Sequence, residues 1–188
     1  MSEASRPSRL TLSISPLTRP EPSFSTLPTL ELVTPRRWDL AVKWRFFQAL
    51  QWGHDPDAER VYRWMIAKRS GHRMQAGIAT DQWKLTLTDY VNTASALLSS
   101  MRAGGFSAER PIPIDPDGEL LDGSHRVACA LTLGIAEVPV ERRPQRAWAP
   151  PWGEAWFLAN RIWDKDLERV RRDYLALTQL DSPMALSR

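Results

Sequence analysis

The sequence contains a single cysteine, Cys129, and has no apolar run of about 18 residues. One cysteine excludes an internal disulfide framework and any metal site built from several cysteines. The lack of a long apolar run excludes a transmembrane helix, and the opening segment MSEASRPSRLTLSISP lacks the continuous apolar stretch of a secretory signal. We therefore expect a cytoplasmic protein without a membrane span.

The excess of positive charge is also small. The 25 basic side chains exceed the 22 acidic ones by three, which does not argue for binding to nucleic acid. The charges are unevenly placed, because residues 36–110 hold twelve basic and seven acidic side chains, whereas residues 111–140 hold one and five. The two segments could pack by charge complementarity, or a cationic wall could face an acidic catalytic edge, and the sequence does not choose between these readings.

A length of 188 residues with 43% hydrophobic residues suits one domain of ordinary size. Residues 1–35 hold six of the fifteen prolines, together with seven serines and five threonines, and this composition predicts a flexible or extended N-terminal arm. Alternation at Leu30, Leu32 and Val33 predicts a short docking strand at its end. We assign residues 36–182 to the single domain and residues 183–188 to a C-terminal tail.

Helical spacing of apolar residues dominates both ends of this domain. A first helix is expected between Pro35 and Gly53, and a second from Asp55-Pro56-Asp57, which supply a cap and a helix-starting proline, to a stop at Ser70-Gly71. Residues 71–85 look like a loop. Further helices are predicted from Thr88-Asp89 to Gly104-Gly105 and near 153–163 and 165–180.

The middle of the chain has a different pattern. Residues 111–114 and 119–121 read as short strands joined by a turn at 115–118, residues 123–133 as a helix, and residues 138–140 as a third strand. Pro139 argues for an edge strand or a strand end. These elements predict an α+β protein with a small mixed sheet flanked by helices, or a small α/β layer fold.

The most informative segment is the turn from Asp122 to Arg126, which joins a predicted strand directly to a predicted helix. Such a turn directs backbone N–H groups toward one point, and Gly123 permits the close approach of a phosphate. Ser124, His125 and Arg126 add donors, while Asp122 could hold Mg²⁺ or orient a hydroxyl. Alternatively, Asp122 and Ser124 only cap the helix and Arg126 pairs on the surface.

The succession Ile-Pro-Ile, turn, Leu-Leu-Asp-Gly-Ser-His-Arg and Val-Ala-Cys-Ala-Leu-Thr-Leu-Gly resembles the core of the ParB/sulfiredoxin superfamily over residues 111–140. The resemblance implies a nucleotide-binding core in which Gly123, Ser124, His125 and Arg126 hold phosphates at the start of a helix. Sulfiredoxins require a cysteine where this chain has Ser124. Chromosome-partitioning ParB proteins continue into a helix-turn-helix, of which the last fifty or so residues here give no convincing sign.

Two other branches are closer. Free serine kinases carry Asp-Gly-His-His-Arg at this turn, and a subgroup from bacterial polysaccharide biosynthesis combines Asp-Gly-Ser/Ala-His-Arg with an upstream helix bearing Asp-x-x-x-Lys. Asp39 and Lys43 match that second pattern. The resemblance therefore implies an ATP-dependent kinase for a small hydroxyl-bearing molecule such as a sugar or amino-acid derivative, with Asp122, Asp39 and Lys43 as catalytic residues and Mg²⁺ at Asp122.

Several alternatives stay open at this stage. The protein could be a non-catalytic nucleotide-binding switch or partner-binding module, and a ParB-like nuclease is disfavoured by the small net charge. Asp39 and Lys43 lie at i and i+4 and could form an ordinary surface ion pair, or Lys43 could face phosphate while Asp39 acts on a substrate hydroxyl. Cys129 is expected to be a buried, inert thiol. The acceptor, the nucleotide and the oligomeric state are not predicted.

Overall fold

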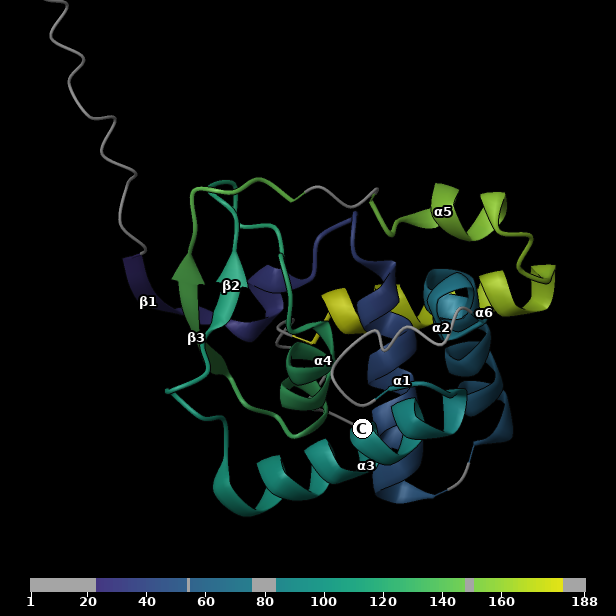
Figure 1. Ribbon diagram of the computed structural model, residues 1–188, viewed down its shortest axis with the longest axis horizontal. Coiled ribbons are helices and arrows are strands. Elements are labelled where there is room, and N and C mark those ends of the chain that lie inside the picture. The colour runs from purple at the N-terminus through teal and green to yellow at the C-terminus, as the bar shows by residue number, and fades with distance from the viewer. Residues whose placement is uncertain (1–22, 54, 76–83, 148–150, 181–188) are drawn as a thin grey trace, which may run out of the picture.

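The computed structural model describes residues 23–53, 55–75, 84–147 and 151–180, with the backbone alone for 71–75. The predicted tail at 183–188 and residues 1–22 of the predicted arm lie outside these ranges. The described residues form a three-stranded sheet and six α-helices, which confirms the α+β class (Figure 1). No helix among them is long and apolar enough to cross a membrane.

The sheet combines β1 (Ser23–Pro28), β2 (Ile112–Ile114) and β3 (Glu137–Arg142) in the order β1-β3-β2, with β1 antiparallel and β2 parallel to β3. The strand predicted at Leu30–Val33 is wrong, because β1 ends at Pro28 and a short 3-10 helix, η1 (Thr29–Leu32), follows. The Thr29 hydroxyl donates a hydrogen bond to the carbonyl of Ile135, and Leu32 is buried in the core. Part of the predicted arm is thus an integral strand of the sheet.

Two other strand predictions are corrected. Pro139 lies in β3, which is the central strand rather than an edge, but the ladder with β2 begins only at Val140 and leaves Pro139 paired with β1 alone. The strand predicted at 119–121 is reduced to a single bridge between Ile114 and Leu120. The carboxylate of Asp115 accepts two backbone N–H bonds that close the intervening turn. The chain then enters the next helix within four residues of the bridge, which leaves no room for a second strand.

The helices agree with most of the predicted periodicity. They are α1 (Trp38–Trp52), α2 (Pro56–Gln75), α3 (Leu87–Gly104), α4 (Ser124–Thr132), α5 (Glu154–Ala159) and α6 (Asp164–Thr178). The stop predicted at Ser70-Gly71 is wrong, because α2 continues to Gln75 and takes the first five residues of the predicted loop into the helix. A glycine inside a helix costs only about 1 kcal/mol, and Ser70 is buried in the packed part of α2. Residues 76–83 lie outside the described ranges.

Helix α1 forms the centre of the core and contacts α2, α3, α4 and α6. Figure 1 shows the sheet on one side of the molecule and α1, α2 and α6 on the other, with α4 between them. Phe46 of α1 stacks on Tyr62 of α2 with ring centroids 4.0 Å apart. Because helices surround α1, its residues 39–44 are all buried, including the charged Asp39 and Lys43. A charged pair thus sits inside the core beside α4.

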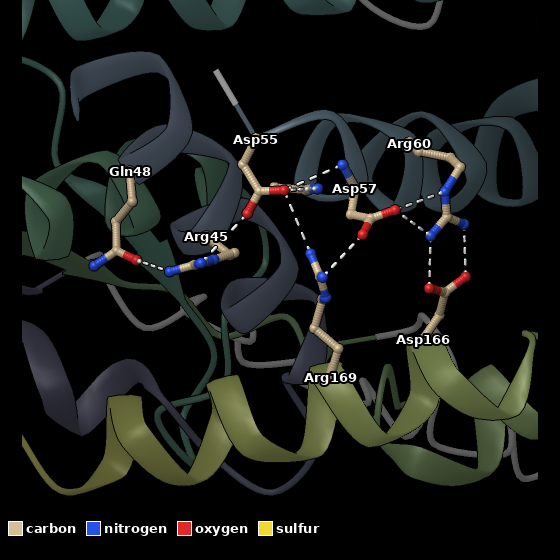
Figure 2. Close-up of polar contacts among 8 residues, drawn as sticks. Arg45, Gln48, Asp55, Asp57, Arg60, Asp166 and Arg169 are labelled. Atoms are coloured by element: carbon tan, nitrogen blue, oxygen red, sulfur yellow. Dashed lines mark hydrogen bonds and ion pairs between the residues drawn. The ribbon is translucent and has the colours of Figure 1, made fainter. Parts of the chain in front are cut away.

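An ionic network fastens α6 to the start of α2 (Figure 2). Asp55 caps α2 through its Oδ1, which accepts hydrogen bonds from the N–H groups of Asp57 and Ala58. The Arg60 guanidinium contacts both oxygens of Asp166 at 2.6 and 2.7 Å. Arg169 of α6 reaches back to the Asp57 carboxylate at 3.0 Å. The two helices are therefore joined at several points along their shared edge.

Candidate functional site

The turn before α4 depends on a glycine. Gly123 has a left-handed backbone with φ 86°, and a Cβ built on it would lie 2.7 Å from Ile112 Cδ1 and 2.9 Å from Arg126 Nη2. The interpretation that Asp122 or Ser124 caps the helix is wrong, because Gly123 occupies the N-cap position and Ser124 is the first helical residue. The N-cap residue therefore supplies no side chain to the N–H groups of the first turn of α4, which are the groups that bind anions in other helices.

A pocket of about 310 Å³ opens at this end of α4, between the turn and α3. This volume is at the lower end of the range for small-molecule sites. Three cationic side chains line it, namely Lys84, Arg110 and Arg126, while Asp122 is its only carboxylate among the described residues. Ser124 also belongs to the lining. The pocket thus combines an excess of positive charge with the N-terminal end of a helix, which suits a small anionic ligand.

Lys43 lies directly behind the pocket. Its side chain is fully buried, and its Nζ lies 2.6 Å from Asp39 Oδ2 and 2.7 Å from Ser124 Oγ. The alternative of an ordinary surface ion pair is therefore wrong. The structure brings together three of the residues singled out in the sequence, because α1 places Asp39 and Lys43 on the side that packs against the first turn of α4.

Asp39 is held on its other side by Arg37, which the sequence analysis missed. Arg37 Nε lies 2.8 Å from Asp39 Oδ1 and its Nη2 lies 3.0 Å from Oδ2, a bidentate arrangement, while Nη1 donates to the carbonyl of Leu120 at 3.3 Å. Both carboxylate oxygens of Asp39 therefore face cations, and Asp39 does not line the pocket. The only signal in the sequence was an arginine two residues before the acid, which is too common to be informative.

Burial and mutual attraction set the protonation of this cluster. Burial raises the pKa of Asp39, but the nearby charges of Arg37 and Lys43 outweigh it and hold that pKa well below its usual range. Burial, assisted by the positive charges of Arg69 and Arg37, lowers the pKa of Lys43 to about 7, although the Asp39 carboxylate partly opposes it. Lys43 is therefore divided between its neutral and charged forms near neutral pH.

His125 follows Ser124 and lies against α2. Its Nε2 is 2.9 Å from the hydroxyl oxygen of Tyr62, and the two rings meet edge to face. Burial and the positive charge of Lys43 lower the pKa of His125 well below its ordinary value. Its ring is therefore neutral at neutral pH and offers a hydrogen bond, not a positive charge, to the pocket that it lines.

Arg126 has a structural partner as well as a place in the pocket. Its Nη1 donates to the carbonyls of Arg110 and Pro111, which hold the segment leading into β2. Burial lowers the pKa of Arg126, with Asp122 opposing the shift. The side chain thus positions Arg110 at the rim while its own guanidinium lines the pocket.

Comparisons with known proteins identify no relative. No protein-family model, no curated protein and no solved structure matches this chain. The resemblance to the ParB/sulfiredoxin superfamily therefore rests on the motif at 111–140 and remains a prediction.

The donor set does not fit a Mg²⁺ ion held by the protein itself. Within the described ranges, no three His, Cys, Asp or Glu side chains lie close enough together to hold a metal. Asp122 is exposed and is the single carboxylate of the pocket, and the oxygens of Asp39 are taken by Arg37 and Lys43. The described residues therefore do not fit a Mg²⁺ ion bound by protein side chains alone.

Cys129 lies on the core side of α4 and is fully buried, as predicted. Burial raises the pKa of its thiol to about 12, so the thiolate is scarcely populated at neutral pH. Cys129 therefore belongs to the packing of α4 and not to the chemistry of the pocket.

Proposed function

We propose that the pocket at the N-terminal end of α4 binds the phosphates of a nucleotide, and that the protein transfers phosphate from ATP to a small hydroxyl-bearing molecule such as a sugar or amino-acid derivative. The observation that carries the proposal is the convergence of Lys84, Arg110 and Arg126 with a helix N-terminus on one pocket. Phosphoryl transfer depends mainly on positioning and charge neutralisation, and this lining provides both.

The second candidate is a nucleotide-binding switch without catalysis. What favours phosphoryl transfer is the buried cluster behind the pocket, because binding of a phosphate needs no buried lysine beside a serine. Desolvating a charged group is costly, and such clusters concentrate at sites of chemistry. The motif at 122–126 and its similarity to free serine kinases support the same choice. Mg²⁺ would arrive with the nucleotide, coordinated by its phosphates and water.

The binding part of the proposal is tested by calorimetric titration of ATP, with Mg²⁺ present, into the wild type and two arginine variants. Arg110→Ala removes a cation from the pocket rim and should weaken ATP binding by about 10-fold or more. Arg102→Ala removes an exposed arginine of α3 that does not line the pocket and should change the affinity by less than about twofold. Absence of ATP binding at millimolar concentration would contradict the proposal.

Catalysis is tested separately by following ADP formation in the presence of panels of sugars and hydroxyl amino acids. Acceptor-dependent ADP formation that is lost in the Lys43→Met variant supports the kinase. Tight ATP binding without ADP formation for any acceptor favours the switch.

A further inference from the structure

The cluster behind the pocket has an uneven charge balance. Arg37 is a permanent cation, and its bidentate contact with Asp39 already neutralises that carboxylate. A charged Lys43 would therefore leave one uncompensated positive charge in a fully buried position. With Lys43 as a neutral amine, the buried cluster has no net charge, which agrees with the lowered pKa of about 7.

The contacts of Lys43 determine what a neutral amine would do. Lys43 Nζ contacts the Asp39 carboxylate, which can only accept a hydrogen bond, and the Ser124 hydroxyl, which can also donate one. In the structure, Nζ donates to both Asp39 Oδ2 and Ser124 Oγ. When Lys43 is neutral, an N–H still serves Asp39, and the lone pair can accept the Ser124 O–H across the same 2.7 Å contact. Ser124 in turn lines the pocket at the first residue of α4.

A serine hydroxyl hydrogen-bonded to an amine and facing a cationic pocket is the arrangement of an activated nucleophile. We propose that Ser124 is a covalent nucleophile with Lys43 as its general base, and that phosphate passes from ATP to the acceptor through a phosphoserine at Ser124. This inference rests on the proposed function for the identity of the phosphate donor. It adds a two-step mechanism and a modified residue to that function.

In the first step, Lys43 Nζ accepts the Ser124 hydroxyl proton while Oγ attacks the γ-phosphorus of ATP. The bond between that phosphorus and the bridging β–γ oxygen breaks, and ADP leaves with the electron pair. In the second step, the acceptor hydroxyl attacks the phosphoserine, the P–Oγ bond breaks, and Lys43 returns its proton to Ser124 Oγ while the acceptor proton passes to solvent. The sum is ATP plus acceptor giving ADP, the phosphorylated acceptor and one proton.

Other residues have supporting roles in this scheme. Arg37 and Asp39 are positioning residues, since they hold the amine of Lys43 toward Ser124 without lining the pocket. The start of α4 and Arg126 line the same pocket as Ser124, so their backbone N–H groups and guanidinium would stabilise charge that develops on the transferring phosphoryl group.

The test is to mix the full-length protein with ATP and Mg²⁺, quench with acid over a range of times, and follow the intact mass and the modified peptide. The wild type should gain one phosphoryl group on Ser124 with release of about one ADP per protein. Ser124→Ala should lose this label while its ATP affinity changes by less than about 10-fold. Ser100→Ala, at an exposed position of α3, is the matched control and should be labelled like the wild type.

The role of Lys43 as general base is tested by the rate of Ser124 labelling and by the dependence of that rate on pH. Lys43→Met should slow labelling by about 100- to 10,000-fold, the range of general-base catalysis, in protein whose circular dichroism matches the wild type. In the wild type, the rate constant at low ATP should rise about tenfold per pH unit below pH 7 and level off above it. Asp39 and His125 titrate at lower pH, and Arg37 and Arg69 are permanent cations. None of these groups facing Lys43 therefore adds a further change in the labelling rate near pH 7.

The outcomes separate the two proposals. ATP binding without phosphorylation of Ser124, labelling of another residue, or an unchanged labelling rate in a folded Lys43→Met variant overturns the nucleophile and leaves the proposed function standing. No ATP binding at all overturns the proposed function, and the nucleophile with it.

Discussion

Gly123 connects Asp122 to the first turn of α4 with a backbone φ of 86°. An alanine there would adopt a left-handed conformation that costs about 1–2 kcal/mol, and its Cβ would overlap Ile112 and Arg126. Overpacking of this kind adds about 1–3 kcal/mol. Gly123→Ala should therefore lower the free energy of unfolding by about 2–5 kcal/mol, measured by urea denaturation.

Gly134→Ala is the matched control, because Gly134 also has a positive φ but faces open space. It should cost only the conformational part, about 1–2 kcal/mol. An equal decrease in the free energy of unfolding for both variants would show that the close contacts at Gly123 do not affect stability.

Arg37 is a second position where one side chain supports the site. It is 7% exposed and holds both oxygens of the buried Asp39 as well as the carbonyl of Leu120. Arg37→Ala leaves a buried acceptor and carboxylate short of partners and should lower the free energy of unfolding by about 3–5 kcal/mol. Arg146→Ala breaks an exposed ion pair with Asp117 and should cost less than about 1 kcal/mol. A cost for Arg37→Ala no larger than that control would contradict the structural role of the cluster.

The sequence analysis identified most residues of the site but not how they are connected. The turn at 122–126 was recognised because strand, glycine and helix signals follow one another locally. That Lys43 and Ser124 meet, although 81 positions apart, depends on α1 being surrounded by other helices. Residues 39–44 are buried all around the helix, so no amphipathic pattern marks the face that carries the pair. Tyr62 joins the site through a long-range contact with His125, and Arg37, although only two residues from Asp39, forms a pair that nothing in the local sequence marks as part of a site.

At the scale of elements, α6 is joined to α2 by ionic contacts that include the nearly buried Asp166 (Figure 2). Asp166→Ala removes the two hydrogen bonds that the half-exposed Arg60 donates to Asp166, and it should destabilise α6 locally by about 1–2 kcal/mol. Hydrogen exchange of amides in 164–178 should accelerate by roughly 10-fold.

Glu168→Ala is the control for this element. It removes an exposed partner of Arg171 on the same helix and should leave the exchange of α6 nearly unchanged. Acceleration confined to α2, with α6 unaffected by Asp166→Ala, would contradict the view that the network fastens α6.

Secondary structure was predictable where apolar periodicity is long and strong. The extents of α1, α3 and α6 follow directly from that pattern, and the mixed sheet was expected from the short strands at 111–114 and 138–140. The errors fall on segments whose secondary structure depends on pairing with residues distant in the sequence. The segment Ser23–Pro28 becomes a strand because it pairs with the edge of β3 that β2 does not cover. Pro139 is tolerated in the central strand because the ladder with β2 begins only at the next residue.

At the scale of the whole molecule, the buried Lys43 links stability to pH. Its pKa is 10.5 in an unfolded chain and about 7 in the folded protein, so between these values the unfolded state binds more protons. The contribution of Lys43 to the free energy of unfolding should therefore rise with pH in this window, by up to about 1.4 kcal/mol per pH unit, and be flat below pH 7.

The measurement is urea denaturation of the wild type and Lys43→Met from about pH 6 to about pH 9.5. The difference in free energy of unfolding, wild type minus variant, should increase through this range. Lys68→Met removes an exposed lysine of the same helix bundle and should give a flat difference. A flat difference for Lys43→Met would show that Lys43 stays charged in the folded protein.

The central claim is that phosphate binds where α4 begins, and the most direct measurement is the change in backbone amide NMR shifts on titration with ADP and, separately, with inorganic phosphate. The largest shifts should fall on Gly123, Ser124, His125 and Arg126, with smaller ones at Arg110. Both ligands should affect the same amides, because both present phosphate oxygens to the first turn of the helix. Saturable shifts centred on another surface, or no shifts at millimolar ligand, would contradict the account.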